Sequence, residues 1–355
     1  MKVLTIAGTR PELIRLCVII EKLDKLVDHT FVYTNQNYDY NLSGLFFEEL
    51  KIRKPDYYFI GESKSFSKFM SSAFEQFEDI LIKERPDKIL ILGDTNSGLL
   101  ALVARKFNIP VYHCEAGNRC YDDRVPEESN RRVIDALSTY NLPYTENSKQ
   151  NLLREGYDKN HVFKIGNPIY EVLTKFRHEI YLSDIEQKLG IEGEKFVLVT
   201  AHRAENVDNL KTLKSIITAL NCISKQFKVI FSIHPRTRDK IEKYNIVFSD
   251  NIVMSRPLGF FDFVNLEKSA KVVISDSGTL VEECCIFNVP SITIRRTTER
   301  QETIECGSNI LSGVEFRDII TSFKAVINRQ NTWTPPQDYM KPDVADTVVN
   351  ILLGK

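Results

Sequence analysis

Acidic side chains follow two apolar, strand-like runs in the first half of the chain. Asp94 comes directly after one run, and Glu115 comes two residues after the next. A helix-like stretch then opens with Glu127 and Glu128 in its first turn. Acids at this point of a helix commonly serve only the helix dipole, which describes Glu128 well, whereas Glu127 could face the other two carboxylates. Crowded carboxylates tend to raise at least one pKa, as general acid–base catalysis requires.

Cations and histidines follow the corresponding runs in the second half. His202 and Arg203 follow one run, and His234 follows the next. A third run ends in Asp276-Ser277-Gly278-Thr279, and the helix after it carries Glu282-Glu283. A strand, Ser-Gly-Thr and a helix N-terminus can cradle a phosphate, and carboxylates one turn later can accept ribose hydroxyls. A lone histidine after a strand is more often structural, but two at strand ends that face one crevice favour a site.

The first strand-like run ends in Gly8-Thr9-Arg10-Pro11-Glu12. Gly8 permits a tight turn, Thr9 can cap a helix and Pro11 suits its first turn. A helix N-terminus beside Arg10 can hold an anion, although the same residues describe an ordinary turn with a solvated arginine. Acids in the first half and cations in the second suit a substrate with a pyrophosphate at one end and acid–base chemistry at the other.

Short apolar runs alternate with amphipathic segments along the chain. Continuous Val/Ile/Leu runs such as 88–92 are typical of parallel strands buried on both faces, and the alternation implies right-handed βαβ units. The expected strands are 2–7, 30–33, 88–92, 111–113, 162–165, 196–200, 228–233, 251–254, 271–275 and 291–294. The clearest expected helices are 11–24, 67–84, 126–137, 209–223, 279–287 and 344–353.

The alternation weakens between 167 and 194, where we expect a hinge. The predicted fold class is α/β, with two doubly wound Rossmann-like domains facing each other across a cleft. We place the N-terminal domain, with the acid–base carboxylates, at 1–168. The C-terminal domain, with the predicted phosphate turn, is placed at 169–339, and the last helix, in 340–355, is expected to join the first domain.

Composition excludes several classes of protein. Lys plus Arg (47) nearly cancels Asp plus Glu (48), which argues against nucleic-acid binding. The apolar N-terminus is too short for a signal peptide, and no stretch reaches the ~20 apolar residues of a membrane span.

The 7 cysteines include no CxxC, so we expect reduced thiols in a cytoplasmic protein, with Cys284 and Cys285 as small core residues. No Walker loop, GxGxxG or zinc spacing occurs, which argues against an ATPase, a dehydrogenase or a metalloenzyme.

In their order and spacing, these motifs resemble those of the non-hydrolysing UDP-N-acetylglucosamine 2-epimerases, and they span nearly the whole chain. The matching segments are Gly8-Thr9-Arg10-Pro11-Glu12, Gly93-Asp94-Thr95, Glu115-Ala116-Gly117, Pro126-Glu127-Glu128, Asn130-Arg131, His202-Arg203, Glu205-Asn206, Asp276-Ser277-Gly278, Glu282-Glu283 and Thr298-Glu299-Arg300. The resemblance implies a glycosyltransferase-B-like fold, a homodimer, and a UDP-N-acetylamino sugar bound in the interdomain cleft. It implies C2 epimerisation by anti elimination and re-addition of UDP, with no cofactor and no metal, in the synthesis of surface polysaccharide precursors.

The resemblance also assigns residues. It places Asp94, Glu115 and Glu127 in the acid–base cluster and His202 near the departing phosphate. The residues it implies for binding the substrate and its UDP are Arg10, Arg15, Arg203, His234, Phe263, Ser277, Gly278, Thr279, Glu283 and Arg300.

Some segments depart from the commoner pattern of the family. Arg15 replaces a lysine, and Thr279 replaces a second glycine. Segments 36–40, 52–57 and 115–120 resemble the capsular branch, which forms UDP-N-acetyl-L-fucosamine, whereas 297–300 resembles the general branch. Three further alternatives are a hydrolysing epimerase, a glycosyltransferase and a non-catalytic nucleotide-sugar sensor.

Overall fold

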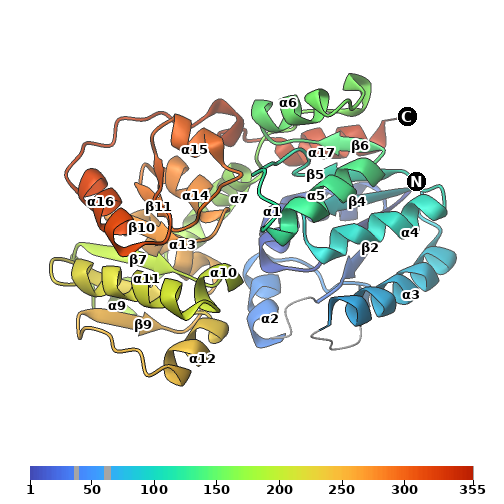
Figure 1. Ribbon diagram of the computed structural model, residues 1–355. Coiled ribbons are helices and arrows are strands. Elements are labelled where there is room, and N and C mark those ends of the chain that lie inside the picture. Colours follow the sequence, from blue (N-terminus) through green and yellow to red (C-terminus); the bar gives the residue numbers. More distant parts are fainter. Residues whose placement is uncertain (36–39, 60–64, 355) are drawn as a thin grey trace. The chain divides into compact units, whose positions relative to one another are not determined.

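The computed structural model describes residues 1–35, 40–59 and 65–354, and Figure 1 shows its helices and strands. The chain forms two compact units, Met1–Lys175 with Gln337–Lys355, and Phe176–Pro336. Each unit holds one six-stranded sheet in which the paired strands run parallel. The predicted α/β class with two doubly wound Rossmann-like halves is confirmed. Residues 36–39 of the first capsular-type segment lie outside the described residues.

The sheet of the first unit has the order β3-β2-β1-β4-β5-β6. Its strands are β1 Lys2–Ala7, β2 Asp28–Tyr33, β3 Tyr57–Tyr58, β4 Lys88–Leu92, β5 Val111–Cys114 and β6 Tyr140–Leu142. Successive side chains of a strand point to opposite faces. Leu4 and Ile6 join a core cluster with residues of α3 (Phe66–Glu84) and α4 (Ala101–Lys106), while Val3 and Thr5 are also buried. Burial on both faces explains why these strands are continuous apolar runs.

Helix α1 (Arg10–Leu26) packs against α7 (Ile169–Lys175) and the C-terminal helix α17 (Val344–Leu353). The backbone N–H of Ala345 donates to Glu171 Oε2 at 2.8 Å, and Lys22 Nζ lies 2.6 Å from Asp346 Oδ1. The last helix of the chain is therefore part of the first unit. The unit's other helices are α2 Tyr40–Glu49, α5 Pro126–Leu137 and α6 Glu146–Arg154, with short 3₁₀ turns η1 Asn96–Leu100, η2 Lys159–His161 and η3 Gln337–Tyr339.

The sheet of the second unit has the order β12-β11-β10-β7-β8-β9. Its strands are β7 Phe196–Thr200, β8 Lys228–Ser232, β9 Ile252–Ser255, β10 Val272–Ser275, β11 Ser291–Thr293 and β12 Asn309–Leu311. Val197 and Val199 pack with α11 (Leu210–Ile223) and α16 (Phe316–Ile327), whereas Phe196 and Leu198 pack with α13 (Phe260–Ser269) and α14 (Leu280–Phe287), so helices cover both faces. The unit's helices are α8 Arg177–Tyr181, α9 Ile185–Lys188, α10 Ala204–Val207, α11 Leu210–Ile223, α12 Pro235–Lys243, α13 Phe260–Ser269, α14 Leu280–Phe287, α15 Gln301–Glu305 and α16 Phe316–Ile327.

Most predicted elements are present, and several have the predicted bounds, but the strand expected at 162–165 was wrong. Val162 makes only an isolated bridge to Asn141 beside the edge strand β6. The N–H of Ile165 donates to the carbonyl of Pro143, but proline has no N–H to return a ladder bond. The short strands β3, β6 and β12 were not predicted, because two or three residues give no periodicity.

Candidate functional site

The strand order of each sheet reverses beside the unit's first strand, between β1 and β4 and between β7 and β10. In open parallel sheets, ligands bind beyond the carboxyl ends of the strands at this switch point. In the first unit those ends continue into Gly8-Thr9-Arg10 and Gly93-Asp94-Thr95. In the second unit they continue into Ala201-His202-Arg203 and Asp276-Ser277-Gly278. Four of the segments singled out by sequence thus lie at the two switch points.

Glu12, in the first turn of α1, ties the two switch-point loops of the first unit together. Its Oε1 accepts the Thr95 hydroxyl at 2.6 Å, and its Oε2 accepts the backbone N–H groups of Gly8 and of Thr9, the latter at 3.1 Å. The side chain is buried. This burial raises the pKa of Glu12 to about 7, and nearby Asp94 adds to the rise, while the hydrogen bonds oppose it.

We expect the free energy of unfolding to fall as the pH rises from about 5 to about 8, and expect Glu12→Gln to remove most of this fall. Because its pKa is raised, Glu12 holds its proton more tightly in the folded state than in the unfolded state. Its contribution to the free energy of unfolding is therefore complete below the usual pKa of 4.5 and is lost as the pH rises through about 7. The shift corresponds to about 3 kcal/mol at full ionisation. Urea unfolding across this pH range measures it. Glu78→Gln, on the exposed face of α3, should keep the wild-type profile, and identical profiles for wild type and Glu12→Gln contradict the assignment.

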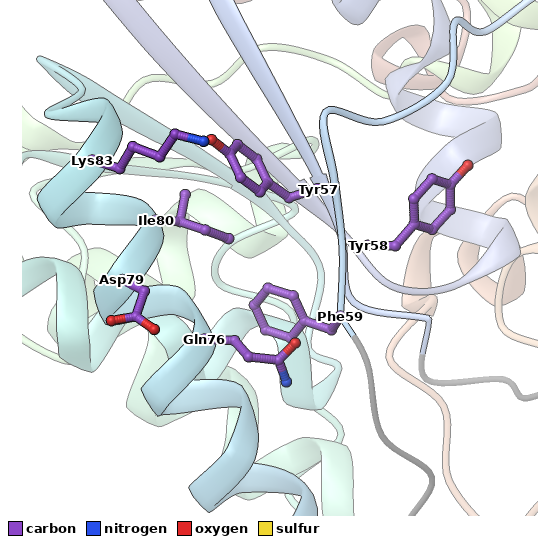
Figure 2. Close-up of a pocket in the computed structure, with 7 residues that line it drawn as sticks. All are labelled: Tyr57, Tyr58, Phe59, Gln76, Asp79, Ile80 and Lys83. Atoms are coloured by element: carbon purple, nitrogen blue, oxygen red, sulfur yellow. The ribbon is translucent and has the colours of Figure 1, made fainter.

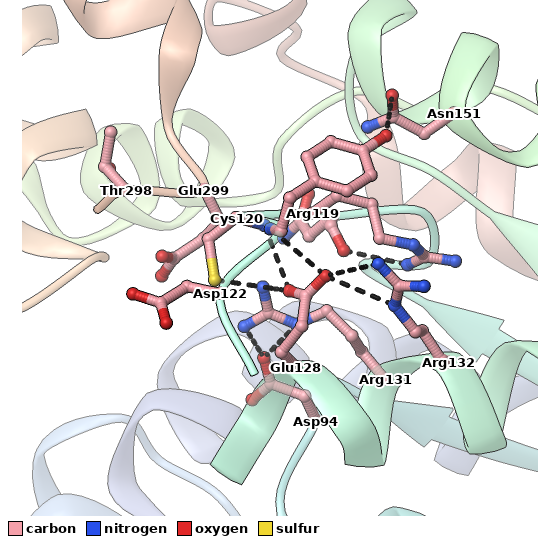
Figure 3. Close-up of polar contacts among 12 residues, drawn as sticks. Asp94, Arg119, Cys120, Asp122, Glu128, Arg131, Arg132, Asn151, Thr298 and Glu299 are labelled. Atoms are coloured by element: carbon pink, nitrogen blue, oxygen red, sulfur yellow. Dashed lines mark hydrogen bonds and ion pairs between the residues drawn. The ribbon is translucent and has the colours of Figure 1, made fainter. Parts of the chain in front are cut away.

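Asp94 lies against Arg131 of helix α5 (Figure 3). Asp94 Oδ2 accepts Arg131 Nη2 at 2.6 Å and Nε at 3.1 Å, and Arg131 Nη1 donates to Glu128 Oε2 at 3.1 Å. The Arg131 side chain is 2% exposed, whereas that of Asp94 is 27% exposed. The amide of Asn130 also donates to the Asp94 carbonyl at 3.0 Å. Helix α5 therefore orients a carboxylate that remains partly open to solvent.

Glu115 has a left-handed backbone, with a φ of 69°. This conformation is uncommon for a residue with a Cβ and often marks a functional position. Its Oε1 accepts the Asn118 amide at 3.1 Å. Its Oε2 lies 3.9 Å from the place where a Cβ on Gly93 would stand. The Glu115 carboxylate therefore lies beside the loop that carries Asp94.

Glu127 is half-buried in the first turn of α5, and its neighbour Glu128 is buried. Glu128 accepts the N–H of Cys120 at 3.0 Å and that of Tyr121 at 3.3 Å, and it pairs with Arg132 at 3.2 Å (Figure 3). The interpretation of Glu128 as a residue that only favours the helix dipole was wrong. Its carboxylate fixes the loop before α5 to the helix itself.

A network of buried charged side chains contacts the loop that carries Asp94. His113 Nδ1 lies 2.8 Å from Asp135 Oδ1, and His113 Nε2 lies 2.8 Å from the Gly93 carbonyl. Arg119 Nη2 lies 2.8 Å from Asp135 Oδ2, and the same guanidinium binds both carboxylate oxygens of Glu155. The side chains of His113, Asp135 and Arg119 are 0% exposed. The network fixes the backbone immediately before Asp94.

Gly117 closes the Glu115 loop where the backbone passes very close to α6. Its φ is 79°, and a Cβ there would stand 2.2 Å from the Ser148 carbonyl oxygen. Gly156 has a similar φ of 90° but no atom within 4 Å of a built Cβ. We expect Gly117→Ala to lower the free energy of unfolding by about 1–3 kcal/mol more than Gly156→Ala, because only the first adds overpacking to backbone strain. Urea unfolding measures both, and equal losses contradict the close approach.

Asp276 organises the switch point of the second unit. Its buried carboxylate accepts the N–H groups of His202 at 3.0 Å and Arg203 at 2.9 Å, and the Asn206 amide at 3.0 Å. His202 Nδ1 lies 3.2 Å from Asp276 Oδ1, and the His202 and His234 rings lie 6.0 Å apart between centroids. The structure therefore places both predicted histidines and Arg203 together at one end of the sheet.

The predicted phosphate turn leads directly into α14. Ser277 Oγ lies 3.1 Å from Thr279 Oγ1, and Thr279 occupies the N-cap position of the helix without a side-chain capping hydrogen bond. A Cβ on Gly278 would stand 2.4 Å from Glu299 Oε1, so a larger residue would displace that side chain.

Two buried acids follow this turn. Burial and the neighbouring Glu283 raise the pKa of Glu267 well above its usual value. Glu282 Oε1 lies 2.5 Å from Arg300 Nε, and both side chains are buried. This ion pair holds Arg300 against α14.

Three other predicted residues lie in ordinary packing positions. The half-buried Arg10 guanidinium lies 5.6 Å from the centroid of the Phe46 ring. Arg15 is buried, and its Nη1 donates to Asn167 Oδ1 at 3.3 Å. Phe263 is half-buried at the start of α13 and packs on the core.

The sequence assigned no role to several residues that hold these side chains in place. They are Glu12, Arg131, Asp135, Glu267 and Asp276. Glu12, Arg131 and Asp276 stand inside matching motifs, which was a usable signal. Asp135 and Glu267 stand in ordinary helical sequence, where nothing marks them.

A pocket of about 230 Å³ lies beside the edge strand β3 and helix α3 (Figure 2). It is lined by Tyr57, Tyr58, Phe59, Gln76, Asp79, Ile80 and Lys83. It contains none of the predicted substrate residues.

The described part of the chain holds neither a membrane-spanning helix nor a cluster of metal-binding side chains. None of its helices combines the length and apolar character needed to cross a bilayer. No group of three or more His, Cys, Asp or Glu side chains there could hold a metal ion.

Comparison with known proteins gives the family. The family model described as UDP-N-acetylglucosamine 2-epimerase matches residues 21–353. The chain is 38% identical over 350 residues to a UDP-N-acetylglucosamine 2-epimerase of Methanocaldococcus jannaschii, covering 95% of each chain. It is 34% identical to a UDP-2,3-diacetamido-2,3-dideoxy-D-glucuronate 2-epimerase of Pseudomonas aeruginosa, covering 93% of each. The crystal structure of the M. jannaschii UDP-GlcNAc 2-epimerase in complex with UDP-GlcNAc and UDP superposes with a TM-score of 0.94 at 37% identity, over 99% of each chain. The chain belongs to the UDP-N-acetylglucosamine 2-epimerase family.

Proposed function

We propose that the protein interconverts UDP-N-acetylglucosamine and UDP-N-acetylmannosamine at C2 without net hydrolysis. One observation carries the proposal beyond family membership. The Asp94 carboxylate follows a switch-point strand of the first sheet and accepts hydrogen bonds from Arg131, while the Glu115 carboxylate lies beside the loop that carries Asp94 and accepts the Asn118 amide. A C2 epimerase needs an acid and a base at one carbon, and a protein that only binds a nucleotide sugar needs neither.

In the proposed reaction, a carboxylate of the Asp94, Glu115 and Glu127 cluster removes the C2 proton while UDP leaves C1 on the opposite face. The enzyme retains a 2-acetamidoglucal and UDP, and UDP adds back after a proton reaches the other face of C2. The negative charge that develops on the departing β-phosphate needs fixed cations and hydrogen-bond donors. His202, Arg203 and His234 supply these from the second sheet, where Asp276 holds the backbone of the first two.

The remaining predicted residues are assigned to the UDP. Ser277, Gly278 and Thr279 would hold a phosphate at the start of α14, and Glu283 would accept the ribose hydroxyls. Arg300 and Arg15 would add charge, and Phe263 would pack on the uracil.

We expect Arg10→Ala to weaken UDP binding by about 10- to 100-fold, because one charge-assisted hydrogen bond to a phosphate is lost. Arg10 is half-buried at the N-terminus of α1, where the helix dipole also favours an anion. Titration calorimetry with UDP measures the affinity. Arg105→Ala removes an exposed arginine from α4 of the same unit and should leave the affinity unchanged. Equal affinity for wild type and Arg10→Ala contradicts the assignment.

Product analysis tests the proposed function directly. The purified protein is incubated with UDP-N-acetylglucosamine alone, and the nucleotides and free sugars are separated. We expect a mixture of the two UDP-sugars at equilibrium with only traces of free sugar. Stoichiometric UDP and free N-acetylmannosamine would identify a hydrolysing epimerase. Turnover only with an added sugar acceptor would identify a glycosyltransferase, and binding without any conversion would identify a sensor.

The alternative substrate is the C2 epimer of UDP-N-acetyl-L-fucosamine, suggested by Asn118-Arg119-Cys120. In the structure these three residues have supporting roles: Asn118 binds Glu115, Arg119 pairs with Asp135, and the Cys120 N–H binds Glu128. Such positions do not favour one sugar over another, so the D-gluco substrate is the first to assay. A homodimer in the cytoplasm, with a role in surface polysaccharide synthesis, completes the proposal.

A further inference from the structure

Two cysteines of the second unit lie in direct contact. Cys285, near the end of α14, and Cys306, which caps the end of α15, have their sulfur atoms 3.6 Å apart, and both are free thiols. Disulfide sulfurs lie about 2.05 Å apart. Closing the remaining distance needs a side-chain adjustment of about 1.5 Å. The sequence predicted a core role for Cys285 but gave Cys306 no partner, because the two positions are far apart in the chain.

The two thiols differ in access and in acidity. Cys285 is buried, whereas Cys306 is half-buried. The contact with Cys285 and hydrogen bonding with Ser308, whose hydroxyl oxygen lies 3.4 Å from the Cys306 sulfur, lower the pKa of Cys306 to about 6. Hydrogen bonding to Cys306 and burial raise the pKa of Cys285. The accessible thiol is therefore the nucleophile, since the thiolate is the reactive form of cysteine.

We propose that Cys285 and Cys306 form an oxidative modification site, which a low-molecular-weight disulfide such as glutathione disulfide converts to an intramolecular disulfide. The Cys306 thiolate attacks one sulfur of glutathione disulfide and forms a mixed disulfide, and one glutathione thiolate leaves. Cys285 then attacks the Cys306 sulfur, and its proton passes to the second departing glutathione thiolate. Two protein thiols are oxidised and one glutathione disulfide is reduced to two glutathione molecules.

The bond would join two helices that already share a contact at their other ends. Glu282 in the first turn of α14 contacts Arg300 at the start of α15, with Oε1 and Nε 2.5 Å apart. A disulfide between Cys285 and Cys306 would also join the C-terminal ends of helices α14 and α15. The site lies outside the set of side chains assigned to catalysis, so it does not depend on the proposed reaction.

The fluorescence of Trp333 can report on the state of the two cysteines. It is the single tryptophan of the chain, and its indole N–H donates to the Cys285 carbonyl at 3.1 Å. The Arg329 guanidinium lies 5.6 Å from the centroid of the Trp333 ring. Because disulfides quench indole fluorescence, formation of the bond should lower the emission of this residue.

The test treats the native full-length protein with excess glutathione disulfide, alkylates the remaining thiols and maps the peptides. We expect loss of two of the 7 thiols, a linked peptide pair containing Cys285 and Cys306, and reduced Trp333 emission, all reversed by dithiothreitol. Cys285→Ala should trap glutathione on Cys306, which also separates Cys285 from the adjacent Cys284. Cys306→Ser should form no linked peptide.

Cys222→Ser is the matched control, because Cys222 is the other half-buried cysteine and should not take part. It should give the same linked peptide as the wild type. Retention of all thiols by the native wild type overturns the proposal, whatever the variants do. A linked pair that involves a different cysteine, or loss of the reaction in Cys222→Ser, overturns it equally.

Discussion

Asp94→Asn is expected to lower kcat by about 10²- to 10⁴-fold, the usual contribution of a general acid or base, without weakening the binding of UDP. Asparagine matches the shape of aspartate and keeps an oxygen to accept the hydrogen bonds of Arg131, which Asp94 now receives at 2.6 and 3.1 Å. It cannot carry the proton to or from C2. Arg131 also retains its contact with Glu128, so its buried charge stays balanced.

The measurement combines steady-state kinetics with calorimetric titration of UDP. Asp79→Asn, on the exposed face of α3, is the matched control and should retain wild-type kcat. Glu115→Gln and Glu127→Gln should each lower kcat by orders of magnitude as well. Near-normal kcat in all three carboxylate variants would exclude this cluster as the source of acid–base catalysis.

Arg119→Met is expected to lower the free energy of unfolding by about 3–5 kcal/mol, the typical loss when one partner of a buried ion pair is removed. Arg119 and Asp135 are both 0% exposed, with Nη2 and Oδ2 2.8 Å apart. Methionine replaces the length of the side chain but leaves the Asp135 charge with only His113 and the Gly117 N–H. Because the same network fixes Gly93, we expect activity to fall together with stability.

Arg124→Met supplies the control for this prediction. Arg124 also binds a carboxylate through two nitrogens, with Nε and Nη2 at 2.7 and 2.8 Å from the oxygens of Asp122, but its side chain is 69% exposed. Exposed ion pairs contribute about 0–1 kcal/mol. Urea unfolding of both variants measures the difference. A loss below about 1 kcal/mol for Arg119→Met would mean that Asp135 finds other compensation.

The sequence predicted the layout of the molecule well because parallel strands buried on both faces are nearly pure apolar runs. Such runs also have a defined carboxyl end, and the residues directly after it must lie at one edge of the sheet. Asp94, His202 and Ser277 could therefore be placed just after the strand ends from the sequence alone. The reversal of strand order that makes these edges binding sites follows from pairing between distant strands, which no local pattern encodes.

The supporting residues were harder to predict because their partners are distant in the chain. The raised pKa of Glu12 depends on burial beneath the Thr95 loop, 83 positions away. The raised pKa of Glu267 depends on burial and on Glu283, which lies on a different helix. Glu128 was misread because its first-turn position offered a sufficient local explanation, whereas its hydrogen bonds reach back to Cys120 and Tyr121.

The central claim is that the protein removes and returns the proton at C2, and solvent isotope exchange tests it most directly. The purified protein is incubated with UDP-N-acetylglucosamine in deuterated water without any cofactor and followed by NMR. We predict loss of the C2 proton signal together with new UDP-N-acetylmannosamine signals, and Asp94→Asn should suppress both. Epimerisation that retains the original C2 proton would contradict proton transfer through solvent-exchangeable carboxylates. No change in the UDP-sugar at all would contradict the proposed substrate.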